Sequence, residues 1–161
     1  VQYMQRIREY YLGQGYEKPY MWANFEDVPF TSLKKPLSES VVTLFSTSDV
    51  SVRRDEGEIL PAMETTVGEV YSVPWNTPID ELYCRQESFD HYATSLDDID
   101  AYLPLNRLRE FVQAGRIGAV TDNFHNINRG YSQKLMAETS APAALAKCNE
   151  EGADIAILTP V

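Results

Sequence analysis

Polar side chains gather where three predicted strands end. They are Ser46, Thr47 and Ser48, then Asp122 through Asn126, and finally Thr159. Because the carboxyl ends of parallel strands meet at one edge of a sheet, we expect these groups to converge there. Hydroxyls and free backbone N–H groups at such an edge suit a small carboxylate ligand. The same residue types also form ordinary turns by bonding their own backbone, which is their commoner role.

The two histidines, His91 and His125, are the side chains suited to moving protons near neutral pH. A single histidine is more often structural, however, and neither has a second His or Cys at ligand spacing, so we expect no metal site. Asp97, Asp98 and Asp100 lack the spacing of a calcium loop. Their place just before a predicted helix favours capping of its first turn.

The two cysteines, Cys84 and Cys148, are too few for a disulfide framework and favour a reducing, cytoplasmic environment. Cys148 lies three residues after Leu145, in step with the buried face of a predicted helix, which favours a small core residue. The role of Cys84 stays open. Neither cysteine begins a helix after a strand, the setting that lowers a thiol pKa. The sequence also has no glycine-rich phosphate loop and no Gly-x-Ser-x-Gly elbow.

Composition restricts the class of protein. A chain of 161 residues fits one domain with a sizeable core, and 43% hydrophobic with 24% charged residues argues against wholesale disorder. The net charge of −10 argues against nucleic-acid binding, which needs clustered Lys and Arg. No apolar run approaches the roughly 18 residues that span a membrane. The first residues lack the apolar segment of a secretion signal.

The elements that must position these groups alternate between helix and strand. Helices are predicted over residues 3–12, over 105–112, and over 133–151 in one or two pieces broken near Pro142. Strands are predicted over residues 41–45, 117–120 and 155–158, with a short one over 67–73. The rest of 51–94 is undecided. The β-branched and aromatic run 41–45 is typical of a strand buried on both faces.

This order predicts an α/β fold with an open, mostly parallel three-layer sheet of the Rossmann-like or flavodoxin-like kind. Residues 1–40 are expected to form a helix and an irregular arm rich in proline and aromatic residues, and residues 41–161 the α/β domain. After the last predicted strand a crossover helix would normally follow. We therefore expect an incomplete domain that ends at Val161, with its open strand edge covered in a homo-oligomer.

Several segments match the pattern of one family. The most specific is Lys34-Lys35-Pro36-Leu37-Ser38-Glu39-Ser40, and further matching positions are residues 16–20, 22–23, 28–31, 33, 98–99, 104–105, 107–110, 115, 117–118, 150–154 and 158–161. Together they resemble the amino-terminal part of selenoprotein B-type subunits in the glycine/sarcosine/betaine reductase and D-proline reductase family. The resemblance covers most of the chain. The family's His-x-His-Tyr-Asp-like motif stands here as Phe89-Asp90-His91-Tyr92-Ala93, which keeps one histidine.

The resemblance implies a reductase component that acts on a small amine-bearing carboxylate. In that family a selenocysteine or cysteine follows the last strand, and its selenolate or thiolate attacks the substrate carbon and cleaves a C–N bond with electrons derived from a dithiol. The nucleophile would then follow Val161, and this chain would hold no cofactor and have no activity alone. His91 or His125 would manage protons, while the strand-end hydroxyls hold the carboxylate.

Two rival interpretations stay open. The first is a non-catalytic binding or assembly subunit, complete at Val161, whose aromatic arm docks a partner chain. The second is a racemase-like enzyme, which needs a thiol at each of two strand ends and finds none in residues 46–49. The expected partners are therefore a small carboxylate, further copies of the chain or other reductase subunits, and neither nucleic acid nor membrane.

Overall fold

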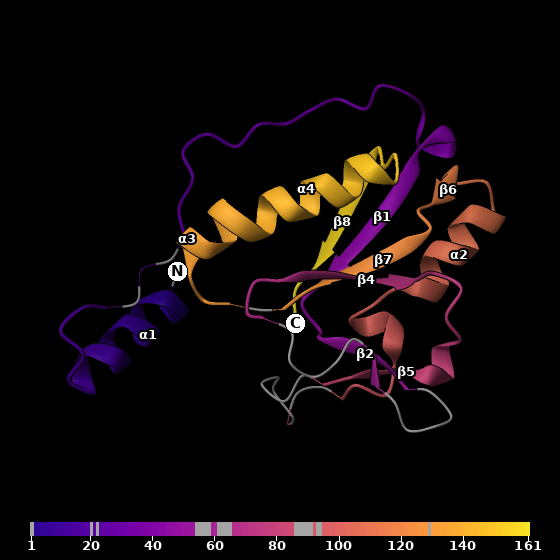
Figure 1. Ribbon diagram of the computed structural model, residues 1–161. Helices are drawn as coiled ribbons and strands as arrows, with labels where there is room; N and C mark the ends of the chain where they lie inside the picture. Colours follow the sequence, from indigo (N-terminus) through magenta and orange to yellow (C-terminus); the bar gives the residue numbers. More distant parts are fainter. Residues whose placement is uncertain are drawn as a thin grey trace. The chain divides into compact units, whose positions relative to one another are not determined.

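The computed structural model describes residues 2–19, 21, 23–53, 59–60, 66–85, 92, 95–128 and 130–161 (Figure 1). The α-helices are α1 (Gln2–Gly13), α2 (Leu105–Gln113), α3 (Gln133–Leu135) and α4 (Ala141–Glu150). Single helical turns are η1 (Leu37–Glu39), η2 (Ile79–Glu81), η3 (Ile99–Ala101) and the π-helical η4 (Met136–Ser140). The strands are β1 (Val41–Ser46), β2 (Val50–Arg53), β3 (Ile59–Leu60), β4 (Val70–Pro74), β5 (Leu82–Cys84), β6 (Ala119–Val120), β7 (Asn123–Ile127) and β8 (Ile155–Thr159).

The chain divides into two compact units, Val1–Thr31 and Ser32–Val161. In the first unit, helix α1 has no buried residue. Two of its tyrosines, Tyr10 and Tyr11, contact each other edge to face at 5.6 Å, and Tyr11 also contacts Tyr16, just after the helix, at 5.5 Å. Among the described helices, none is long and apolar enough to cross a membrane.

The second unit is built on a mixed, mostly parallel sheet, sheet A, as the alternation of helix and strand predicts. Strand β1 pairs in parallel with β8 along one side and with β6 and then β7 along the other. Strand β4 pairs with β7 in the antiparallel sense. The described strands do not close into a barrel. This confirms the α/β class.

The interruption between β6 and β7 corrects one expectation. Residues 117–120 were expected to form a complete short strand, followed by Asp122 at the carboxyl edge of the sheet. The strand instead resumes at Asn123, because Thr121 Oγ1 donates to the Asn123 carbonyl at 2.7 Å and Glu151 accepts the Asn123 backbone N–H at 3.0 Å. Asp122 therefore lies at a break within the sheet and away from the carboxyl edge.

The main hydrophobic core lies on one face of sheet A. Side chains alternate between the two faces of a strand, so every second residue of β1, β4 and β7 contributes to this core. These residues are Val42, Leu44, Tyr71, Val73 and Phe124. The antiparallel sheet B (β3-β2-β5) and helix α2 pack against them through Val50, Val52, Leu82, Leu105 and Leu108. Sheet B comes from the segment that sequence patterns leave undecided.

Helical residues run from Gln133 to Glu150, but the α-helix is interrupted just before Pro142, near the expected break, because the π-helical turn η4 separates α3 from α4. A proline has no N–H and its ring crowds the carbonyl four residues earlier. The wider π-helical turn η4 stands just before it and accommodates both effects. Ser140 in this turn donates to the Gly68 carbonyl at 2.8 Å, which joins the helix to the start of β4. Figure 1 shows α4 alongside β8 and β1.

The segment before β1 fixes where that strand begins. Lys35 pairs with Asp154 at 2.6 Å, and the same carboxylate accepts the Val41 backbone N–H at 2.8 Å. Both contacts lower the pKa of Asp154, the Lys35 contact most. Gly118 packs directly against the backbone of Glu39, because a Cβ added to Gly118 would lie 2.7 Å from the Glu39 carbonyl carbon. These contacts hold the starts of β1, β6 and β8 together.

Candidate functional site

The carboxyl ends of β1, β7 and β8 lie at one level of sheet A. Ser46, the last residue of β1, pairs with Asn126 of β7 on one side and with Thr159 of β8 on the other. The structure therefore brings three of the sequence-predicted site residues together. The turn after Ser46 leads directly into β2.

The side chains of Ser46, Ser48 and Asn126 are fully or almost fully buried and serve the turn itself. The hydroxyl oxygens of Ser46 and Ser48 are 2.7 Å apart, and Ser46 Oγ also accepts the Ser48 backbone N–H at 3.1 Å. Asn126 Oδ1 accepts the Val50 backbone N–H at 3.3 Å. These bonds are the turn-forming role that the sequence left open. In the part of the chain that the structure describes, Asn126 Nδ2 has no partner.

An ion pair, not predicted from sequence, fixes the tip of this turn. Asp49 adopts a left-handed backbone conformation with φ 52°, which is uncommon for residues other than glycine, although Asp tolerates it better than most. Its carboxylate accepts from Arg85 Nη2 at 2.6 Å and from the Tyr71 hydroxyl at 3.1 Å. Burial and the adjacent negative charge raise the pKa of Tyr71, so its hydroxyl stays a neutral donor. Arg85 is 36 residues from Asp49, and no local pattern relates the two.

Cys84, whose role the sequence left open, contacts the same turn. Its thiol donates to the Ser48 carbonyl at 2.6 Å. Among the described residues, neither Cys84 nor Cys148 forms a disulfide, and burial raises the pKa of the Cys148 thiol. The Cys148 thiol therefore lacks the lowered pKa of an activated nucleophile.

Thr47 is the half-buried hydroxyl of the turn, and it links the turn to the end of β8. Its backbone N–H donates to the Thr159 carbonyl at 3.3 Å, and its Oγ1 accepts the Val161 backbone N–H at 2.9 Å. Thr159 Oγ1 donates to the Phe45 carbonyl at 3.2 Å. Val161 consequently lies against the hydroxyl-rich turn, as expected if the two form one site.

His125 lies on the opposite face of sheet A from the serine side chains. It pairs with Phe45, one residue before Ser46, and adjacent residues of a strand point to opposite faces. The ring is completely buried, stacks on Phe45 at 4.6 Å and lies 3.0 Å from Ser72 Oγ through Nδ1. Its Nε2 is 3.7 Å from Glu151, beyond hydrogen-bond distance. Burial lowers the pKa of His125 most, against the opposing charge of Glu151. His91, the other proposed proton carrier, lies outside the described residues.

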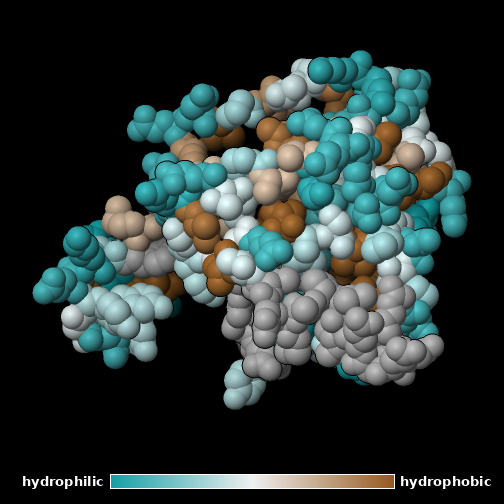
Figure 2. Space-filling model, in the orientation of Figure 1, coloured by the Kyte–Doolittle hydropathy of each residue, from teal (hydrophilic) through white to brown (hydrophobic). Residues whose placement is uncertain are grey.

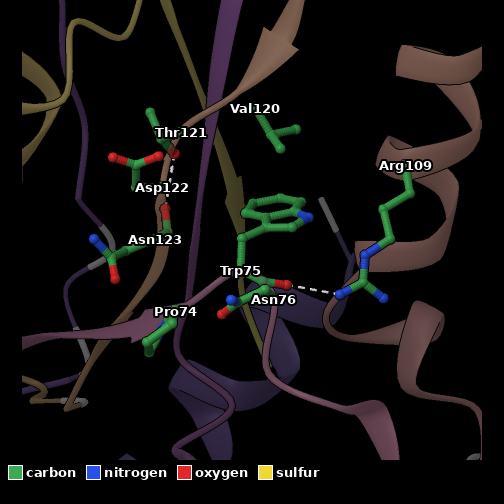
Figure 3. Close-up of a pocket in the computed structure, with 8 residues that line it drawn as sticks. All are labelled: Pro74, Trp75, Asn76, Arg109, Val120, Thr121, Asp122 and Asn123. Atoms are coloured by element: carbon green, nitrogen blue, oxygen red, sulfur yellow. Dashed lines mark hydrogen bonds between the residues drawn. The ribbon is translucent and has the colours of Figure 1, made fainter.

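A second site, which sequence patterns did not predict, lies at the break between β6 and β7. Figure 3 shows a pocket of about 660 Å³ there, with Trp75 at its centre and Arg109 reaching in from α2. Its other lining residues are Pro74, Asn76, Val120, Thr121, Asp122 and Asn123. Asp122 therefore belongs to this pocket. Trp75 and Arg109 come from the end of β4 and from α2, so only the tertiary fold joins them.

Comparison of the chain with models of protein families, with curated proteins and with solved structures gave no match. The resemblance to the reductase family thus stays a prediction. Within the described residues, no group of three His, Cys, Asp or Glu side chains is placed to hold a metal ion.

The Thr47–Val161 hydrogen bond can be tested by hydrogen exchange. Thr47→Val removes the acceptor oxygen with little change in shape, whereas Thr47→Ser keeps it. Because one such bond contributes about 1 kcal/mol, we expect the Val161 amide to exchange about fivefold faster in Thr47→Val and near the native rate in Thr47→Ser, measured by NMR. Equal rates in both variants would show that this bond does not hold the strand end.

Buried His125 should make stability depend on pH. The pKa of a histidine in an unfolded chain is about 6.5, and burial makes the pKa of His125 lower in the folded chain. As the pH falls below the unfolded pKa, the unfolded state therefore binds more protons than the folded state. The contribution of neutral His125 to the free energy of unfolding is thus complete above about pH 7, and it is lost as the pH falls towards the pKa of His125 in the folded chain. His125→Gln should cost about 1–3 kcal/mol at pH 7.5 through lost packing and hydrogen bonding.

The difference in the free energy of unfolding between the native chain and His125→Gln should become smaller as the pH is lowered from 7.5 to 5. Denaturant unfolding at each pH measures it. Carboxylates that do not interact with His125 affect both proteins alike, so the difference reports on the histidine together with Glu151, which lies 3.7 Å from it. A difference that stays constant over this range would contradict a depressed His125 pKa.

Proposed function

We propose that this chain is the amino-terminal part of a reductase component of the glycine/sarcosine/betaine reductase and D-proline reductase type. It would act on a small amine-bearing carboxylate, through a selenocysteine or cysteine that follows Val161. The family resemblance supplies this chemistry. The observation that supports the proposal is the 2.9 Å hydrogen bond from the Val161 N–H to Thr47 Oγ1, because it holds Val161 itself at the carboxyl edge of sheet A, where ligands of such sheets bind.

The proposal gives the edge residues distinct roles. A chalcogen at this point would begin the element after a strand, where exposed backbone N–H groups favour its anionic form. The proposal assigns the substrate carboxylate to the hydroxyl hydrogen of half-buried Thr47, because Pro160 has no N–H and the Val161 N–H already donates to Thr47 Oγ1. The buried side chains of Ser46, Ser48 and Asn126 stabilise the turn. Since His125 is buried on the other face, His91 is the histidine that the proposal assigns to proton transfer at the edge.

The same proposal includes a three-layer open sheet and a cytoplasmic location. Sheet A with α2 and α4 is the part of such a fold that this chain contributes. The cysteines outside disulfides support a reducing compartment. The substrate is a small carboxylate, and no charged surface for nucleic acid is expected at a net charge of −10.

Activity should require the nucleophile. The test extends the chain through its own downstream codons with cysteine at the first position after Val161, and uses serine there as the matched control. We expect the cysteine form to consume glycine, sarcosine, betaine or D-proline with a dithiol, and the serine form and the chain ending at Val161 to consume none, measured by mass spectrometry. A cysteine form whose thiol alkylates normally but which consumes none of the four would contradict the proposal.

An assembly role is favoured by the exposed edge of the same sheet. Among the described strands, β8 pairs only with β1, so its other side offers unpaired backbone groups. Leu158 on this strand is 68% exposed. Figure 2 shows that hydrophobic patches alternate with hydrophilic residues on the visible face. We propose that β8 pairs with a second copy of the chain or with another reductase subunit.

Self-association through β8 should be sensitive to charge at its exposed position. Leu158→Lys introduces a charge that disfavours edge pairing, while Leu145→Lys places the same charge on α4 as a control. We expect light scattering to show a dimer or larger species for the native chain and the control, and a concentration-independent monomer for Leu158→Lys. A native chain that is monomeric at high concentration would exclude a homo-oligomer.

A further inference from the structure

The pocket at the β6–β7 break contains a buried hydrogen-bond donor without a partner. Trp75 is 7% exposed, and its Nε1 has no hydrogen bond within the described part of the chain. The indole ring is held by an edge-to-face contact with Phe124 at 6.1 Å. In Figure 3 the indole nitrogen lies on the edge of the ring that faces Arg109. A buried N–H with no acceptor is unfavourable, so its position calls for an acceptor that binds there.

Arg109 brings a positive charge and further donors to the same place. Its Nη2 donates to the Trp75 carbonyl at 2.7 Å, which fixes the guanidinium at the pocket. A guanidinium has five N–H donors, and this one bond uses one of them. Of the described carboxylates, none pairs with Arg109, whereas its helix neighbour Arg107 pairs with Asp100 and Glu110. Arg109 therefore offers a charge that no described side chain neutralises.

We propose that this pocket is a binding site for a small aliphatic carboxylate, with Arg109 and the Trp75 indole N–H as the two groups that hold the anion. A carboxylate has two acceptor oxygens in a plane and matches a guanidinium fork. The side chains of Pro74 and Val120 and the indole ring supply apolar wall for a short hydrocarbon chain. The pocket volume of about 660 Å³ lies in the range of small-molecule sites.

The charges around the pocket favour a monoanion over a phosphate. Arg109 is the one cation among the residues that line the pocket, and Asp122 at its wall is exposed and acidic. A dianion would meet a single positive charge in a protein of net charge −10. A carboxylate needs one positive partner. The site is independent of the proposed reductase chemistry, which concerns the carboxyl edge of sheet A.

The indole N–H of Trp75 provides a direct readout by NMR. The chain has two tryptophans, and Trp75→Phe identifies which indole signal belongs to the pocket. The probes are butyrate, its uncharged isostere butyramide and inorganic phosphate, all at equal ionic strength. We expect butyrate to shift the Trp75 N–H downfield with saturation and a Kd on the order of 1 mM, and butyramide and phosphate to leave it nearly unchanged.

Matched substitutions on α2 separate the site from general electrostatics. Arg109→Gln should weaken butyrate binding by about tenfold or more, and Arg109→Lys should weaken it less because the charge remains while the planar fork is lost. Arg107→Gln removes the same charge from an exposed position of the same helix, and affinity should change by less than about twofold.

Three results would overturn the proposal: an equal shift with butyramide, unchanged affinity in Arg109→Gln, or an equal loss in Arg107→Gln. If Arg109→Gln fails to fold, the comparison of the Trp75 N–H shift with butyrate and with butyramide on the native chain decides whether the site binds a carboxylate. Saturable binding of phosphate in place of butyrate would overturn the choice of carboxylate. The tests use the chain as it stands, so their failure leaves the proposal for the carboxyl edge unaffected.

Discussion

The parallel register of β1 is the constraint on which the site geometry depends. Because Ser46 aligns with both Asn126 and Thr159, three strand ends meet at one level, and the turn that follows Ser46 stands above them. The register is fixed at the other end of β1 by Asp154, which accepts the Val41 N–H and pairs with Lys35. A slip of one residue would move every side chain of the strand to the opposite face. The site is thus held by contacts at both ends of a short strand.

The two-residue alternation of a strand decides which polar residues meet. Ser46 and Asn126 point towards the main core and bond the turn, whereas Phe45 and His125 point to the other face and stack there. Proximity in sequence therefore misleads at this point, since His125 and Asn126 are neighbours with different surroundings. Burial then sets their chemistry, because a completely buried imidazole is more easily kept neutral than charged.

Much of the fold follows from periodicity, and much of the site does not. The runs that form β1, β8 and α2 have clear patterns, and the structure has these elements within one or two residues of the expected bounds. Sheet B is missed because its strands are short and its pairing joins Val50 to Cys84, a non-local contact that leaves no local pattern. Asp122 is misplaced because a break in a strand and the end of a strand look alike in sequence. The Asp49–Arg85 pair and the Trp75–Arg109 pocket form only in the tertiary fold, so no local sequence pattern predicts them.

The two candidate sites differ in how their charged groups are paired, and the two proposals rest on this difference. At the carboxyl edge, Asp49 is neutralised by Arg85 and the serine hydroxyls bond within the turn, so the rigid turn can support chemistry performed by a residue from elsewhere in the protein. At the β6–β7 break, Arg109 and Trp75 keep donors without described acceptors. The edge also has two buried donors without a partner among the described residues, Asn126 Nδ2 and Arg85 Nε, but its ions are paired. The pocket instead has a cation that no described carboxylate pairs, and a ligand that pairs with it would gain binding energy. In the two proposals, the edge would position a reacting group and the pocket would hold an anion.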